Sequence, residues 1–362
     1  MNRASLVFAF SILGGCYQSV TVDAPPDAAR RDAGLDAIRF DVAFPDVPPV
    51  DAGPLPTNQV DLVFVIDDSG GMGEEQAFLA AELPSLLTEL LSGSGDVPPV
   101  PSLHVGFVST NMGSHEYSVP TCNDSRDGLL TNSDCMWSDS GLFMDIDGVG
   151  ELEEAACTAG NFGDSGCGYE QPLEAMLKAL TPTGSSIRFF DDTRGHGDLH
   201  AGFLRPGAQL AVVVLANEDD CSAMDSEIYN SSSGRFTPDL NLRCAFHEEA
   251  LHPIERYIDG LLAVVPASRL TFATITGIPV DVQNLDYTEI LNDPRMAPRR
   301  DPEEPTALAP SCEASRRGPA FPPRRLLQVA QGLEARGAQA TNISICQNDY
   351  GQFVEFIAQR LR

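Results

Sequence analysis

The sequence predicts an α/β fold: a doubly wound, mostly parallel β-sheet flanked by helices. Three observations support this fold class. Apolar runs alternate along the chain with segments of helical periodicity, as in proteins built from β-α-β units. The runs are apolar at nearly every position, which is typical of strands buried on both faces of a parallel sheet. Hydrophobic residues make up 43% of the 362 residues, enough to bury a full core.

The first element is an export signal. A short basic start is followed by the apolar run 6–13, which is too short to span a bilayer and has the length of a signal-peptide core. The run ends in Leu13-Gly14-Gly15-Cys16, which resembles the bacterial lipobox. We therefore expect residues 1–15 to be removed and Cys16 to be lipidated; the alternative is an ordinary secretory signal followed by an unrelated cysteine.

The segment 16–58 differs in composition from the rest of the chain. It is rich in Asp, Ala and Pro and has few large apolar residues, so it cannot bury enough surface to offset its chain entropy. We interpret it as a disordered tether between the lipid and the folded part. An acidic recognition tail is the alternative.

The remainder, 59–362, carries the alternating pattern. The predicted strands are 60–66, 103–109, 210–216, 270–276 and, with less apolar length, 342–346. The predicted helices are 74–91, 171–180, 253–265, 323–336 and 350–361. Two stretches lack such periodicity, the Gly-rich 111–168 and the Pro- and Arg-rich 281–322, and we interpret both as loop insertions in one domain.

Nine cysteines support export. With Cys16 set aside, eight remain, and an even number in an exported chain indicates disulfides. We expect Cys221–Cys244 and Cys312–Cys346 as pairs, because each brackets a loop next to a predicted strand end. The other four, whose pairing stays open, are Cys122, Cys135, Cys157 and Cys167.

Acidic and hydroxyl side chains follow two of the predicted strands. Asp67, Asp68 and Ser69 come after the first, and 217–222 (Asn-Glu-Asp-Asp-Cys-Ser) come after the third. Ligands of open parallel sheets bind beyond the carboxyl ends of the strands, so these two clusters are expected to meet. Carboxylates at close range need a hard cation or protons to coexist.

The run VDLVFVIDDSGGM resembles the first strand and metal-ion-dependent adhesion site of von Willebrand factor type A (vWA) domains. FLRPGAQLAVVVLANEDDCS and SICQNDY are similar to exported bacterial members of that family. The resemblance implies a loop Asp-x-Ser-x-Ser, with a Thr and an Asp from later loops. Together these residues hold Mg²⁺ or a similar ion, which then takes a carboxylate from a partner protein.

The resemblance assigns ligands to particular residues. Asp67 and Ser69 take the first two positions, whereas the third is Gly71, which offers no oxygen. The late Asp position falls on Asn217, and Glu170 is the candidate substitute for the Thr. Glu218, Asp219 and Asp220 are the candidates that restore negative charge, and of these Asp219 is the expected ligand. The cofactor expected is a divalent cation, Mg²⁺ first, with Ca²⁺ or Mn²⁺ as alternatives.

The net charge and the spacing of two histidines argue against two classes of function. With 52 acidic and 23 basic residues the net charge is −29, which argues against nucleic-acid binding. His247 and His252 are five residues apart and do not reproduce the zinc-protease motif, which spaces its histidines four apart on one helix face. We therefore expect no enzyme, but a lipid-anchored module of the bacterial cell envelope, on the outer membrane, that binds a protein partner. Two alternatives remain: a structural or envelope-assembly protein with a metal-free site, and a metal-dependent hydrolase.

Overall fold

The computed structural model describes residues 59–93, 99–131, 135, 141–237, 239–314, 317–348, 350, 351, 357, 360 and 361. The predicted signal peptide, the lipidation site Cys16 and the tether lie outside these residues, as does most of the predicted helix 350–361. Among the described residues, no helix has both the length and the apolar composition needed to cross a membrane.

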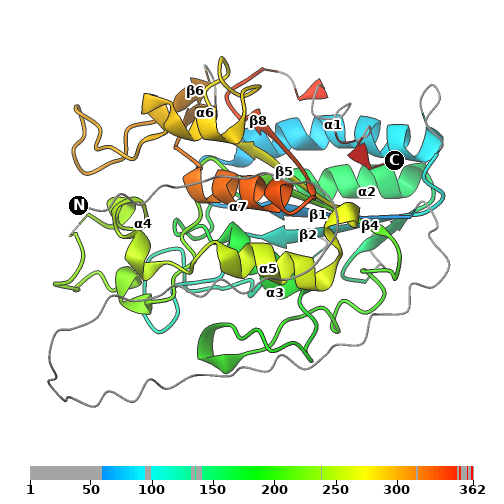
Figure 1. The fold of residues 1–362 in the computed structure, drawn as a ribbon, viewed down its shortest axis with the longest axis horizontal. Coiled ribbons are helices and arrows are strands. Elements are labelled where there is room, and N and C mark those ends of the chain that lie inside the picture. Colours follow the sequence, from blue (N-terminus) through cyan, green and yellow to red (C-terminus); the bar gives the residue numbers. More distant parts are fainter. Residues whose placement is uncertain are drawn as a thin grey trace, which may run out of the picture. The chain divides into compact units, whose positions relative to one another are not determined.

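The core of the fold is a mixed sheet in the order β3-β2-β1-β4-β5-β8 (Figure 1). Each neighbouring pair is parallel except β2 with β3, which is antiparallel. The strands are β1 (Val60–Ile66), β2 (Leu103–Ser109), β3 (Met144–Ile146), β4 (Gln209–Leu215), β5 (Leu270–Thr276) and β8 (Gln339–Ser344). The mostly parallel sheet predicted from the continuous apolar runs is therefore confirmed.

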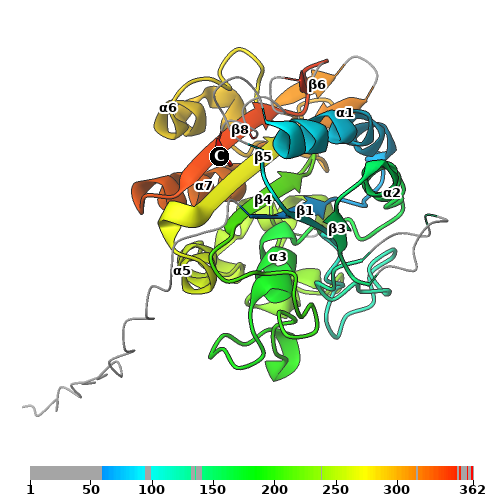
Figure 2. The same cartoon turned by 90° about the vertical axis from the view of Figure 1, so that its right-hand side faces the viewer.

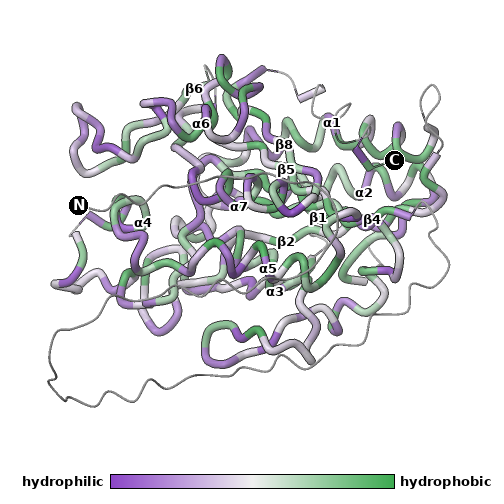
Figure 3. Tube along the Cα trace, in the orientation of Figure 1, coloured by the Kyte–Doolittle hydropathy of each residue, from purple (hydrophilic) through white to green (hydrophobic). Residues whose placement is uncertain are grey.

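Helices cover both faces of the sheet (Figure 2). In β1, Leu62 and Phe64 belong to the buried cluster that includes side chains of α1 and α2, whereas Val63 and Val65 belong to the cluster of α3, α5 and α7. Along α7, the turns of the helix carry both hydrophobic and hydrophilic residues (Figure 3). The bounds are α1 (Gly73–Ser92), α2 (Val149–Gly160), α3 (Pro172–Leu180), α5 (Glu255–Val264) and α7 (Arg324–Ala335).

The two segments predicted as loop insertions contain regular structure. The first holds β3 and α2, and α2 packs against α1. The second holds α6 (Tyr287–Asn292) and a hairpin of β6 (Cys312–Ala314) and β7 (Gly318–Ala320). The other helices of the described chain are short. They are α4 (Arg243–Phe246) and the 3₁₀ helices η1 (Phe190–Asp192), η2 (Ser226–Tyr229), η3 (Leu240–Leu242), η4 (Glu248–Ala250), η5 (Ala267–Arg269) and η6 (Pro294–Met296).

Four disulfides link the loops. The predicted pairs Cys221–Cys244 and Cys312–Cys346 both form. The remaining four cysteines form two disulfides that are nested in the sequence, Cys135–Cys157 within Cys122–Cys167. Structural disulfides of this number are typical of proteins that fold in an oxidising compartment.

A third buried cluster, separate from the two sheet faces, is formed by residues that follow the strands. It contains Cys122, Cys167 and Cys221 together with Tyr169 and Tyr229, whose ring centroids lie 4.9 Å apart. We call it the loop core. It joins the segments after β2, before α3 and after β4 into one packed unit.

Candidate functional site

The site lies where the winding of the sheet reverses. From β1 the chain continues to β2 and β3 on one side, whereas β4, β5 and β8 extend the other side. Ligands of open α/β sheets bind at this switch point, beyond the carboxyl ends of the two central strands. Here those strands are β1 and β4, and the residues that follow them are Asp67 and the segment from Asn217 onward.

Asp67 is completely buried at the end of β1. Its backbone N–H donates to the Leu215 carbonyl (3.0 Å), and its Oδ1 accepts from the Ser69 N–H (2.8 Å). Its Oδ2 is buried and has no hydrogen-bond partner among the described residues. An unpaired buried carboxylate oxygen is costly, so this atom needs a proton, a cation or an ordered water as its partner.

Gly71 lies in the loop after β1, two residues beyond Ser69. Its backbone has φ +97°, a conformation that L-amino acids rarely adopt, and no other atom would crowd a side chain there. Backbone conformation, not lack of space, therefore disfavours a hydroxyl-bearing side chain at this position.

Other buried side-chain oxygens also have no partner within the described residues, among them Asp68 Oδ1 in the same loop and two that follow neighbouring strands. Asn217 Oδ1 follows β4, and Thr110 Oγ1 follows β2 in a side chain that is fully buried. The Thr110 backbone is fixed, because its N–H donates to Ile66 (3.1 Å) and its carbonyl accepts from Gln171 (3.0 Å). Thr110 was not among the residues predicted from the sequence, although its place directly after a strand was a usable signal.

Three carboxyl groups gather beside these oxygens. Burial, followed by the neighbouring carboxyl of Asp68, raises the pKa of Asp67 to about 7. Burial and then the Asp67 charge raise the pKa of Glu218 to about 7. Burial, Glu218 and Asp67, in that order, raise the pKa of Glu170 well above its usual value. Mutual repulsion of this kind places Asp67, Glu170 and Glu218 in one electrostatic cluster.

Asp219, expected as a metal ligand, has a different set of partners. Its carboxylate accepts from the backbone N–H groups of Arg325 (3.0 and 3.1 Å) and Leu326 (3.4 Å), in the first turn of α7. The next residue, Asp220, accepts from Leu173 N–H (3.0 Å) in the first turn of α3. The segment after β4 therefore caps two helices, one on each of its sides.

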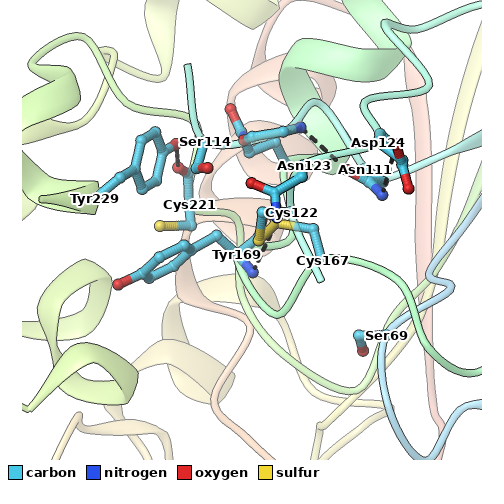
Figure 4. Close-up of a disulfide and its surroundings, with 12 residues drawn as sticks. Ser69, Asn111, Ser114, Cys122, Asn123, Asp124, Cys167, Tyr169, Cys221 and Tyr229 are labelled. Atoms are coloured by element: carbon cyan, nitrogen blue, oxygen red, sulfur yellow. Dashed lines mark hydrogen bonds between the residues drawn. A yellow bond between two sulfur atoms is a disulfide. The ribbon is translucent and has the colours of Figure 1, made fainter. Parts of the chain in front are cut away.

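The loop after β1 is locked to the chain segment before α3. The Gly166 N–H donates to the Asp68 carbonyl (2.6 Å), and a Cβ on Gly166 would lie 2.3 Å from the Asp68 carboxylate. Only glycine permits this approach. One residue further on, Cys167 is joined to Cys122, and Figure 4 draws this disulfide in one view with Ser69, Tyr169 and Cys221.

A small cavity of about 40 Å³ is lined by Glu170, Glu218 and Asp219 together with residues of the loop core, whereas Asp67, Thr110 and Asn217 are not among the described residues that line it. This volume exceeds the roughly 15 Å³ needed to hold one water molecule. By type, the carboxylate, amide and hydroxyl oxygens fit a hard cation that keeps several waters. Within the described residues, however, no three His, Cys, Asp or Glu side chains converge around one point.

Comparisons with known proteins add a weak structural similarity. No protein-family model matches the chain, and no curated protein matches it. Among solved structures, a mutant of the PilB minor pilin from Streptococcus sanguinis is similar with a TM-score of 0.40 and 10% sequence identity. The match covers 86% of this chain and 63% of the pilin chain, so this chain spans less than two thirds of that neighbour. We draw no argument about function from a similarity of this size.

Proposed function

We propose that this chain is an extracytoplasmic binding module of the vWA type, which holds a divalent cation at the switch point and uses it to bind a carboxylate of a protein partner. One observation carries the proposal. Asp67 Oδ2 and Asn217 Oδ1, which follow the two central strands, are buried oxygens with no hydrogen-bond partner in the described part of the chain.

The arrangement of the sheet supports the vWA assignment. The opening run VDLVFVIDDSGGM forms the central strand β1 and the loop after it. The order β3-β2-β1-β4-β5-β8, with only β3 antiparallel, puts the loops of that motif at the switch point. We further propose that Cys16 carries the lipid and that 16–58 tether the module to the outer membrane. No catalytic role is part of this proposal.

The residues suggest how the cation would be held. Asp67, Ser69 and Asn217 would contribute from the loops after β1 and β4, with Thr110 as an additional hydroxyl. Mg²⁺ keeps several waters, so a few protein oxygens are sufficient, and a carboxylate of the partner would replace one water. Glu170 and Glu218, which line the cavity, would attract the cation and balance its charge.

The test is thermal unfolding with and without cation. Millimolar Mg²⁺, Mn²⁺ or Ca²⁺ should raise the melting temperature, because a ligand at about 100 times its Kd stabilises the folded state by about 2.7 kcal/mol. We would measure at about pH 8, where Asp67 and Glu218, whose pKa values are raised to about 7, are mostly ionised. Asp67→Asn and Asp67→Ala should both abolish the rise.

Asp259→Ala is the matched control. Asp259 is exposed on α5 and pairs with Arg336 (2.9 Å), far along the chain from the cluster, so this variant should respond to cation as the wild type does. Equal responses of the wild type and Asp67→Asn would contradict the cation proposal.

A metal-free structural protein is the second candidate. It is favoured by the absence, among the described residues, of three convergent acidic, His or Cys side chains, and by pKa values near 7 that allow protons to replace the cation. In that case, no divalent cation changes the melting temperature at any pH at which the protein is folded.

A further inference from the structure

A second and much larger cavity, of about 500 Å³, lies beside α3. Gln171 is one of its lining residues, whereas the adjacent Glu170 lines the small cavity at the carboxyl cluster. The two cavities therefore lie on either side of one short segment. A volume of this size is typical of pockets that bind small organic ligands.

The wall of this cavity has an aromatic part. Phe190 is 39% exposed, and its ring centroid lies 3.8 Å from that of His115, which also contacts the Tyr229 ring (5.3 Å). Phe189, by contrast, is buried and packs under the cations of Lys178 and Arg256. The planes of the Phe190 and His115 rings are inclined by 40°, so the two residues form an aromatic corner in which the Phe190 ring is partly open to a ligand.

Two cations line this cavity, Lys178 and Arg188, and both have carboxylate partners. Lys178 forms an ion pair with Asp127, and Arg188 lies 3.4 Å from Asp192. Arg256, which does not line the cavity, contacts both oxygens of the lining residue Glu174 (2.7 and 3.0 Å). A further carboxylate, Asp191, also lines the cavity, so the charges of the wall disfavour an anionic ligand.

Uncharged polar groups complete the wall. His115 and His252 both line the cavity, and burial lowers the pKa of each, so both imidazoles are neutral at physiological pH. Asn123 and Ser125 add an amide and a hydroxyl, and Asn123 lies beside the Cys122–Cys167 disulfide (Figure 4). Neutral imidazole, amide and hydroxyl groups both donate and accept hydrogen bonds, as a polyhydroxylated ligand requires.

The backbone of the wall is held in an uncommon conformation. Among the described residues, the non-glycine residues with positive φ are His115, Thr121, Asp127, Asp191 and Asp192. Three of them line the cavity, and the other two are adjacent to lining residues. Such conformations persist only where surrounding contacts enforce them, and they cluster at binding sites.

We propose that this cavity is a binding site for a neutral saccharide, with one sugar face stacked on the partly exposed Phe190 ring and its hydroxyls bonded to Asn123, Ser125 and the two histidines of the wall. A sugar ring has one apolar face and a polar edge, which matches an aromatic surface beside uncharged donors and acceptors. The net charge of −29 and the paired cations disfavour anionic glycans. This proposal is independent of the cation site.

The experiment is an array of neutral oligosaccharides probed with the exported protein in the presence of a chelator, so that the cation site makes no contribution. Sialylated and sulfated glycans and unstructured peptides form the comparison sets. Selective retention on neutral sugars is expected. No retention on any sugar, or retention only on anionic glycans or on peptides, would overturn the proposal.

Variants then locate the binding. Phe190→Ala should weaken binding of the retained sugar at least about tenfold, whereas Phe190→Trp should preserve it, because a sugar face stacks on any aromatic ring. The control is Phe246→Ala, a substitution at a phenylalanine that is 41% exposed and does not line this cavity. Equal affinity of the wild type and Phe190→Ala would exclude this site.

Discussion

The candidate cation site is marked by unpaired side-chain oxygens at the end of the sheet more than by the types of its residues. Asp67 uses one carboxylate oxygen to fix the turn through the Ser69 N–H, which leaves the other oxygen unpaired. Asn217 is similar: its backbone carbonyl accepts from Phe321 (2.7 Å), and its side-chain oxygen is unpaired. In both residues, one polar group positions the loop and another is left over, as expected for a pre-formed ligand.

The buried imidazole of His252 predicts a stability change in acid. Burial, then Arg256 and Arg325, lower its pKa from 6.5 to about 4, while Asp220 opposes them. Between these values the unfolded chain binds a proton that the folded chain does not bind, so stability falls as the pH drops from about 6.5 towards about 4. Urea denaturation at about pH 7 and about pH 4.5 should show a smaller acid loss for His252→Gln than for the wild type.

The control for this prediction is His247→Gln. His247 Nδ1 lies 2.9 Å from Glu249 Oε1 and its Nε2 accepts from the Thr237 N–H (3.2 Å), so its replacement removes local contacts but leaves the His252 imidazole in place, and the acid loss that depends on His252 should persist. If His252→Gln loses as much stability in acid as the wild type, the buried imidazole is not the source of the pH dependence.

At the scale of elements, the sequence predicted most accurately the strands that form long apolar runs. The strands β1, β2 and β5 have the predicted bounds, because each is a run of buried residues. The strand β3 was missed since its three residues carry no readable period. The helix α2 was missed because Ala, Glu, Cys and Gly replace the usual large apolar stripe, and Ala155 and Ala159 do the packing.

The candidate site shows the same limit, because only features that are local in the sequence could be predicted. Asp67 and Ser69 were candidates because they follow a predicted strand closely, which is a local signal. The partners of Asp219 were not predictable, because the first turn of α7 lies 106 residues further along the chain. Capping of this kind depends on how the loop after β4 lies against the first turn of α7, which is visible only in the fold.

Asp219 predicts an effect on stability without an effect on cation binding. Removing its carboxylate leaves the N–H groups of Arg325 and Leu326 without their acceptor, so Asp219→Ala should lower the free energy of unfolding by about 1 kcal/mol, the usual cost of a lost cap. Asp219→Asn, which keeps an acceptor oxygen, should lose less. Urea denaturation measures both variants.

The cation response of the same variants separates the two roles of this residue. If Asp219 only caps α7, the rise in melting temperature on adding Mg²⁺ persists in Asp219→Ala. Loss of that rise with little change in urea stability would instead make Asp219 a ligand.

At the scale of the whole described domain, the two sheet faces and the loop core form separate hydrophobic clusters. The sheet faces supply most of the buried apolar surface, whereas the loop core holds the rim of both proposed sites. Substitutions that remove different disulfides should therefore separate effects on stability from effects on cation binding. Cys346 belongs to a sheet-face cluster and Cys312 packs against it, whereas Cys122 and Cys167 belong to the loop core.

Two paired substitutions test this separation. The disulfides Cys122–Cys167 and Cys312–Cys346 span 45 and 34 residues, so by loop entropy each stabilises the fold by about 4 kcal/mol. The variant Cys122→Ser with Cys167→Ser frees the segment that Gly166 ties to Asp68, and it should lose the Mg²⁺-induced rise in melting temperature. Cys312→Ser with Cys346→Ser should lose similar or greater stability, since it also disturbs a sheet-face cluster, yet keep the rise. If the two variants respond alike to Mg²⁺, the loop core does not position the cation site and the sheet alone does.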